Sequence, residues 1–165
     1  MSKEIHTNID NEKLVKQLAQ LLHGGSAHAS LDEALKGIPE NLRGEVPDKL
    51  PYSIWQLLYH IRITALDMLE FSRNANYKSP IWPDEYWPKE RAPKDDKEWN
   101  QAVKEVNEYI EQFIDLLKDK DADLYKPFPH GDGQSLLHEA LQLADHNSYH
   151  TAEIIVIRRL LGTWK

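Results

Sequence analysis

The chain has 165 residues, which suits a single domain (residues 1–165) whose core is large enough to fold without staples such as disulfide bonds. It contains no cysteine, which excludes a disulfide framework, a thiolate metal site and a cysteine nucleophile, and fits the reducing cytoplasm. The net charge of −7, with acidic and basic residues interspersed, argues against nucleic acid as a partner. The absence of a long uncharged stretch or a signal-like amino terminus predicts a protein that is neither membrane-spanning nor exported.

Apolar residues at helical spacing first appear over residues 11–23 and again, after two glycines, over a short piece at 31–38. The short piece ends at glycine and proline, the usual stop signals. The pattern leaves open whether the two pieces form one kinked helix or two. His23 and His28, which flank the two glycines, are expected to be surface or capping residues.

A second strong helix is expected from Pro51, whose missing N–H suits a first turn, to about Arg73. Its apolar stripe consists of Ile54, Leu57, Leu58, Ile61, Ala65, Met68 and Leu69. His60 lies at the margin of this stripe. Its position alone favours the surface over the interior of a bundle.

Residues 74–94 show no helical pattern but are rich in aromatic residues and proline. A loop this long in a compact domain is usually functional or disordered, and so many large apolar rings argue against disorder. Two interpretations remain open. The loop is either a lid or wall over a pocket, or a packed surface loop or subunit contact.

A third helix is expected after Lys94, where Asp95 and Glu98 resemble a capping box. The connection at 121–134 contains His130-Gly131-Asp132-Gly133, which matches neither the dinucleotide nor the nucleotide fingerprint and is interpreted as a turn into the last helix. No strand-like alternation and no internal repeat is present. Four amphipathic helices with two long connections predict an all-α bundle.

The last helix carries an inward seam in alternating steps of four and three: Leu136, Ala140, Leu143, Asn147, His150, Ile154, Ile157 and Leu161. Asn147 and His150 stand where Leu or Ile would be expected, with His146 beside them. Polar groups in such a seam cost stability unless they find partners, which makes them candidates for function. Imidazoles four residues apart on a helix can reach a common point, as metal ligands do. The alternative is a hydrogen-bonded core histidine.

A third ligand for such a pair would come from a facing helix, and His60 is the one histidine well inside another strong helix. Three neutral imidazoles with an open fourth position form a catalytic pattern that zinc, nickel and ferrous iron all accept. A zinc protease would need Glu directly after the first histidine of the pair as general base. That position is Asn147, so the protease interpretation fails.

Several segments together resemble the DinB-like superfamily of four-helix bundles: Tyr-His-Ile-Arg at 59–62, Asp-His-Asn-Ser-Tyr-His at 145–150, the closing segment 155–164, and the segments 51–55 and 82–88. The resemblance implies an up-down-down-up bundle of the DinB/YfiT type, with the aromatic loop between its second and third main helices. It implies a divalent metal held by His60, His146 and His150, and a homodimer.

Similar families include transferases that use a low-molecular-weight thiol such as bacillithiol or mycothiol, and relatives described as metal-dependent hydrolases. The resemblance therefore makes a thiol S-transferase in detoxification or stress response the leading hypothesis. A hydrolase that activates water is the second, and a non-catalytic helical protein with a polar network or structural metal is the third. Because the chain has no cysteine, any thiol must arrive with a cosubstrate.

This chain departs from a common family pattern shortly after the last histidine, where Gly-Gln is replaced by Ala152 and Glu153. Glu153 either orients an imidazole or alters substrate preference, and both possibilities remain open. Tyr149, Asp145 and Glu153 are candidate partners for the imidazole N–H groups, which usually need an acceptor in a metal site.

Overall fold

The computed structural model describes residues 2–164, and side chains from residue 11 onward. Its helices, in chain order, are α1 (Ser2–His23), α2 (Leu31–Leu35), a short 3-10 helix η1 (Glu40–Leu42), α3 (Ile54–Arg73), α4 (Asp96–Lys118) and α5 (Leu136–Leu160). Within residues 2–164, the only β-type pairing is an isolated bridge between Pro127 and Ser135. The prediction of an all-α fold is confirmed for the described residues.

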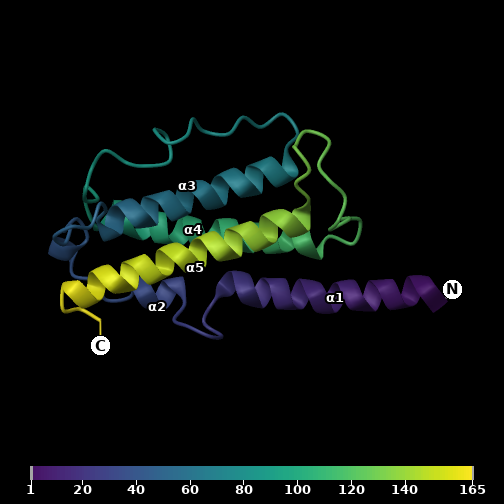
Figure 1. Cartoon of the computed structure of the whole chain (residues 1–165), viewed down its shortest axis with the longest axis horizontal. Helices are drawn as coiled ribbons and strands as arrows, with labels where there is room; N and C mark the ends of the chain where they lie inside the picture. Colours follow the sequence, from purple (N-terminus) through teal and green to yellow (C-terminus); the bar gives the residue numbers. More distant parts are fainter. Residues whose placement is uncertain (1, 165) are drawn as a thin grey trace.

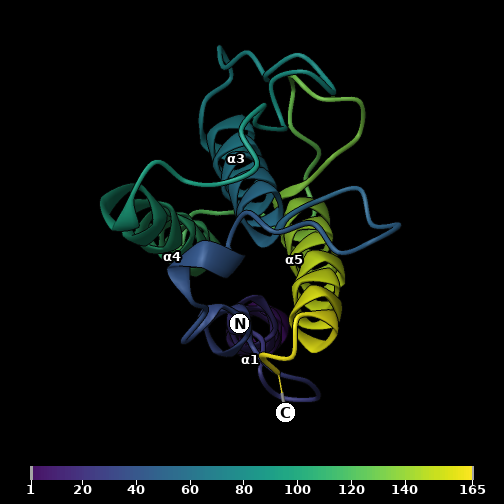
Figure 2. The same ribbon diagram turned by 90° about the vertical axis from the view of Figure 1, so that its left-hand side faces the viewer.

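The long helices pack side by side, with α3 against both α4 and α5, and α1 against the other sides of α4 and α5. Figure 1 shows that α3 and α4 run in one direction while α1 and α5 run in the opposite one. In the end-on view of Figure 2, these four helices surround a common centre. Fully buried side chains such as Leu58, Phe113 and Leu143 fill that centre.

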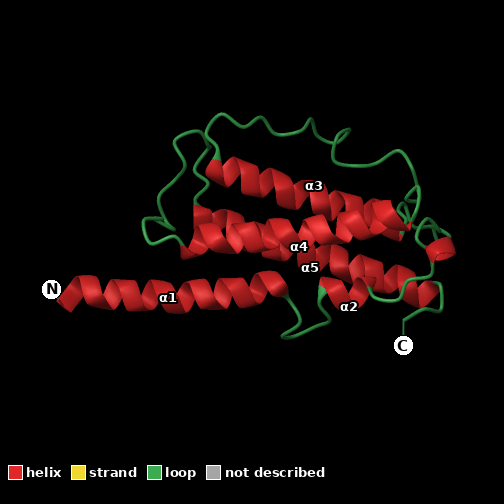
Figure 3. Cartoon of the chain, turned by 180° about the vertical axis from the view of Figure 1, so that it is seen from behind, coloured by secondary structure: helices red, strands yellow, loops and turns green. Residues whose placement is uncertain are grey.

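The parallel course of α3 and α4 explains the long aromatic loop between them. A chain that leaves the end of α3 must return along the whole length of that 20-residue helix, roughly 30 Å, before α4 can begin. Figure 3 shows this loop following α3 from one end to the other. The loop therefore lies against the face of α3 that the other helices leave uncovered.

Side-chain caps determine where the helices begin. The Ser53 hydroxyl accepts a hydrogen bond from the Gln56 N–H, and the Gln56 side chain accepts one from the Ser53 N–H. This reciprocal pair starts α3 at Ile54, so the prediction that Pro51 lies in the first turn is wrong. At α4, Asp95 caps the Glu98 N–H as predicted, but the Glu98 carboxylate binds the Lys94 N–H rather than that of Asp95.

The two amino-terminal pieces are separate helices. Gly24 and Gly25 adopt φ angles of 69° and 81°, a left-handed conformation that ends α1 and that side chains disfavour. A capping box formed by Ser30 and Glu33 then starts α2. At the end of α2, the buried Arg158 guanidinium of α5 donates a 2.7 Å hydrogen bond to the Ala34 carbonyl oxygen.

The connection between α4 and α5 is the predicted turn, and it is fastened to α3. The His130 Nε2–H donates to the Phe71 carbonyl oxygen at 2.9 Å, and the Phe128 N–H donates to the Gln134 carbonyl oxygen at 2.7 Å.

None of the helices in the described part of the chain is both long and apolar enough to cross a membrane.

Replacing Ser53 with Ala is expected to destabilise the protein by about 1–2 kcal/mol, because it removes a helix cap whose hydroxyl also donates to the Arg91 carbonyl oxygen of the aromatic loop. Urea unfolding measures this change. Ser72→Ala on the same helix is the matched control, since the Ser72 hydroxyl has no hydrogen-bond partner among the described residues. Equal stability of the two variants would contradict the role given to the cap.

Candidate metal centre

His60 on α3 and His146 and His150 on α5 lie together, and each offers one ring nitrogen within 4.8 Å of the others. The Nε2 atoms of His60 and His146 are 3.0 Å apart. The structure therefore brings together the three histidines that the sequence singles out. His60 is only 4 % exposed, so the surface position favoured by its place on the helix is wrong. The margin of the α3 stripe is buried because α5 and the aromatic loop cover it.

The outward-facing nitrogen of each imidazole has an acceptor. His60 Nδ1–H donates to the Tyr86 carbonyl oxygen at 3.2 Å, and His150 Nδ1–H donates to the Glu153 carboxylate at 2.7 Å. His146 Nδ1 lies 3.4 Å from the Asn147 amide oxygen. A proton on each Nδ1 leaves a lone pair on each Nε2, the tautomer that metal-binding histidines adopt.

This tautomer makes the centre of the cluster a good fit for a divalent cation. The Nε2 atoms of His60 and His146 are 3.0 Å apart, a separation that suits either one N–H···N hydrogen bond or two ligands of a shared cation. Tetrahedral zinc with bonds of 2.0–2.1 Å to nitrogen would separate its ligand atoms by about 3.3 Å. The separation between His60 and His146 is close to that value. Three such nitrogens leave a fourth coordination position open.

Burial keeps His60 and His146 neutral, the form in which an imidazole binds a metal. The pKa of His60 is lowered from 6.5 to about 3, chiefly by desolvation. Repulsion from His146 and His150 lowers this pKa further, whereas the hydrogen bond to the Tyr86 carbonyl oxygen raises it. The pKa of His146 falls to about 4, again chiefly through desolvation. Both rings are uncharged at neutral pH.

The aromatic loop packs against the histidine cluster. The Trp87 ring stacks on the His60 imidazole with centroids 4.0 Å apart, and Tyr52 stacks on Trp87 at 4.2 Å. The Tyr86 hydroxyl donates a 2.6 Å hydrogen bond to Asp67 of α3, which holds this part of the loop against the helix. These contacts place this part of the loop against His60, and both interpretations of the loop stay predictions.

Among the residues considered as partners for the imidazoles, Glu153 binds His150. Tyr149 instead places its ring edge-on to that of His150, with centroids 4.9 Å apart, and Asp145 is exposed on α5. The sequence analysis missed the other two acceptors. The Tyr86 carbonyl is a backbone group on a loop and leaves no trace in the residue pattern. Asn147 did carry a signal, because its amide interrupts an apolar seam.

A family model described as the DinB superfamily matches residues 26–154. The chain belongs to the DinB superfamily. The match covers all three histidines, and the resemblance inferred from the motifs is confirmed. Searches of curated proteins and of solved structures returned no match.

The free energy of unfolding of the metal-free protein is expected to fall as the pH is lowered from 7 to 5. An unfolded histidine binds a proton near pH 6.5, whereas folded His60 resists protonation until about pH 3, so acid favours the unfolded state. His60→Gln should reduce this loss by about 2 kcal/mol between pH 7 and 5. Urea unfolding at several pH values measures it, with exposed His138→Gln as the control. An unchanged pH dependence in His60→Gln would count against a buried neutral His60.

Proposed function

We propose that this DinB-superfamily protein is an up-down-down-up four-helix bundle that binds one divalent metal ion through the Nε2 atoms of His60, His146 and His150. We propose further that the metal centre makes it an enzyme on small molecules, which transfers a low-molecular-weight thiol to an electrophile. The observation that carries the proposal is the convergence of three imidazoles, each with its Nδ1 facing an acceptor.

A metal held by His60, His146 and His150 would supply a Lewis acid and would favour the thiolate form of an incoming thiol. The protein's own groups position and tune the ligands. Stacking against Trp87 fixes the ring plane of His60. The Glu153 carboxylate orients His150 by accepting a hydrogen bond from its Nδ1–H, as acceptors around metal sites do.

The surroundings of the site suit an apolar electrophile. His146 is only half-buried, so the cluster can be approached from its side. Trp82 is 67 % exposed, and its ring centroid lies 6.2 Å from that of His60, which provides an apolar surface beside the approach. Because the chain contains no cysteine, the thiol comes from the cosubstrate.

A hydrolase is the second candidate, because a metal held by the same three histidines would lower the pKa of a bound water. The signature of the hydrolase is turnover of esters or amides without added thiol.

The remaining aspects of the proposal are cytoplasmic location, a role in detoxification or stress response, and assembly as a homodimer. The lack of cysteine supports a reducing compartment, and the net charge of −7 supports small molecules rather than nucleic acid or a membrane as partners. The homodimer follows from the family resemblance.

Protein loaded with zinc, nickel or ferrous iron should accelerate the conjugation of bacillithiol, mycothiol or glutathione to a model aryl halide, measured by absorbance. His146→Ala should lose this activity while keeping its helical circular dichroism, because it removes a ligand from a half-buried position. His138→Ala, an exposed change on the same helix, should retain it.

Failure of every thiol and metal to exceed the metal-free rate would contradict the transferase. Turnover of an ester and amide panel without thiol would then identify the hydrolase. A His146→Ala protein that loses its fold would favour a structural role for the cluster.

A further inference from the structure

Tyr86 of the aromatic loop is bonded to α3 at two places. Its backbone carbonyl oxygen accepts the Nδ1–H of His60 at 3.2 Å, and its hydroxyl donates to Asp67 Oδ2 at 2.6 Å. His60 and Asp67 are seven residues apart, so they lie on one face of the helix, separated by about 10 Å along its axis. One loop residue therefore spans two turns of α3, with a candidate metal ligand at one end and a carboxylate at the other.

The bond at the carboxylate end is a strong one. A hydroxyl that donates to a carboxylate makes a charge-assisted hydrogen bond, roughly twice as strong as a bond between neutral groups. Asp67 Oδ1 has no hydrogen-bond partner among the described residues, so this carboxylate depends on the Tyr86 hydroxyl. Desolvation, followed by the bond to Asp67 and its charge, raises the pKa of the Tyr86 hydroxyl. The phenol therefore keeps its proton and remains a donor.

Trp87, the next residue of the loop, holds His60 in a different way. Its ring stacks on the imidazole with an angle of 10° between the two planes. Stacking restricts the tilt of the imidazole but does not distinguish its two nitrogens. The Tyr86 carbonyl does distinguish them, because it accepts a proton from Nδ1. The position of this carbonyl therefore decides the tautomer of His60.

The backbone at Tyr86 is not held by a helix or a strand. Its N–H donates to the Pro83 carbonyl oxygen, which belongs to the same loop. The carbonyl of Tyr86 thus has no regular secondary structure to fix its place beside α3. The hydroxyl of the same residue provides a fixed point on that helix through Asp67.

We propose that Asp67 and Tyr86 are positioning residues of the metal centre. Their hydrogen bond holds the Tyr86 carbonyl against His60 and so fixes the tautomer that leaves the His60 Nε2 free for a metal. The effect on metal affinity rests on the function proposed above. The effect on the tautomer is a property of the metal-free protein as well, so the two are measured separately.

The tautomer is read from the ring ¹⁵N chemical shifts of histidine-labelled, metal-free protein, with the His60 signals assigned by their loss in His60→Gln. The unmodified protein should show a protonated Nδ1 and an unprotonated Nε2. Tyr86→Phe and Asp67→Ala should move both His60 shifts towards averaged values. Asp67→Asn should keep most of the original pattern, because its amide oxygen still accepts from the phenol.

Tyr77→Phe is the matched control for Tyr86→Phe. Tyr77 belongs to the same loop and also lies near Asp67, since desolvation and then the charge of Asp67 raise the pKa of its hydroxyl to about 12. Its backbone N–H, however, donates to the Asn74 carbonyl oxygen at the far end of α3 from the metal centre. Tyr77→Phe should therefore leave the His60 shifts unchanged.

Zinc affinity, measured by competition with a chromophoric chelator, tests the consequence for the metal. Tyr86→Phe and Asp67→Ala should each bind zinc about tenfold more weakly. The double variant should be no weaker than either single variant, because both changes remove one hydrogen bond. Ser53→Ala, which releases the loop at Arg91 instead, should keep the original affinity.

Unchanged His60 shifts in Tyr86→Phe, or equal changes in Tyr77→Phe, would overturn the positioning role. Fully additive losses of zinc affinity in the double variant would also overturn it, as would a loss in Ser53→Ala equal to that in Tyr86→Phe. A protein that binds no zinc, but whose His60 tautomer still responds to Tyr86→Phe and Asp67→Ala, would contradict the metal function and support the positioning role.

Discussion

Three imidazole nitrogens face one another between α3 and α5, close enough together to hold one cation. The Nδ1 of each ring faces an acceptor, which favours the tautomer with its lone pair on Nε2. Two of these acceptors come from α5 itself and one from the aromatic loop. The tautomers of the three histidines therefore depend on acceptors that lie just outside the cluster.

The topology of the helices supplies the third acceptor. Because α3 and α4 run parallel, the chain must cross back along α3, and the crossing segment places Tyr86 and Trp87 against His60. The Ser53 cap joins the same loop to the start of α3 through Arg91. The loop between α3 and α4 therefore contributes contacts to the histidine cluster. Its aromatic composition fits this position, since large rings can cover an imidazole and exclude water.

Much of this arrangement is encoded locally and can be predicted. The seam of α5 follows helical spacing, and every one of its members except the half-buried Leu161 is buried. Asn147 and His150 interrupt that seam, which identifies them before any coordinates. The burial of His60 is different, because it depends on a loop that returns from the far end of α3. The position of His60 on its helix does not predict this burial. Only the resemblance of several motifs to one family indicated it.

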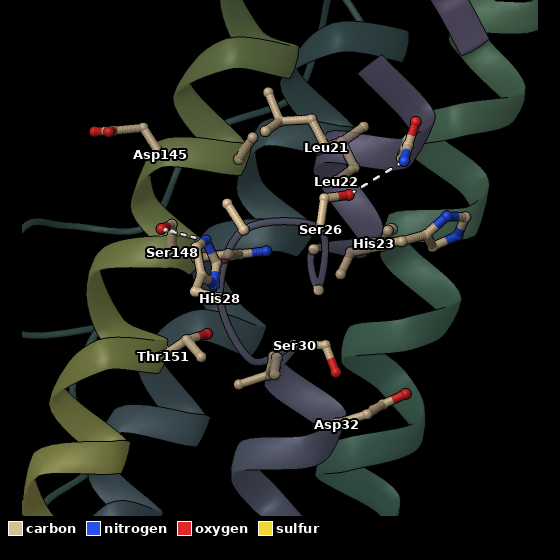
Figure 4. Close-up of a pocket in the computed structure, with 18 of the residues that line it drawn as sticks. Leu21, Leu22, His23, Ser26, His28, Ser30, Asp32, Asp145, Ser148 and Thr151 are labelled. Carbon is tan, nitrogen blue, oxygen red and sulfur yellow. Dashed lines mark hydrogen bonds between the residues drawn. The ribbon is translucent and has the colours of Figure 1, made fainter. Parts of the chain in front are cut away.

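A cavity of about 750 Å³ beside α5, where the chain breaks between α1 and α2, illustrates the same limit (Figure 4). Two adjacent glycines predict a break, but the depth of the resulting space depends on how α1, α4 and α5 meet around it. Asn147 lines this cavity, and its Oδ1 faces the Nδ1 of His146 in the histidine cluster.

The central claim is that His60, His146 and His150 hold one metal ion. Elemental mass spectrometry of untagged protein purified without chelator tests it directly. The account predicts close to one equivalent of zinc, nickel or iron per chain, and loss of that metal when any of the three histidines is replaced by Ala. A protein that is empty and also fails to take up added metal would contradict the account, and would leave the three histidines as polar residues of the core.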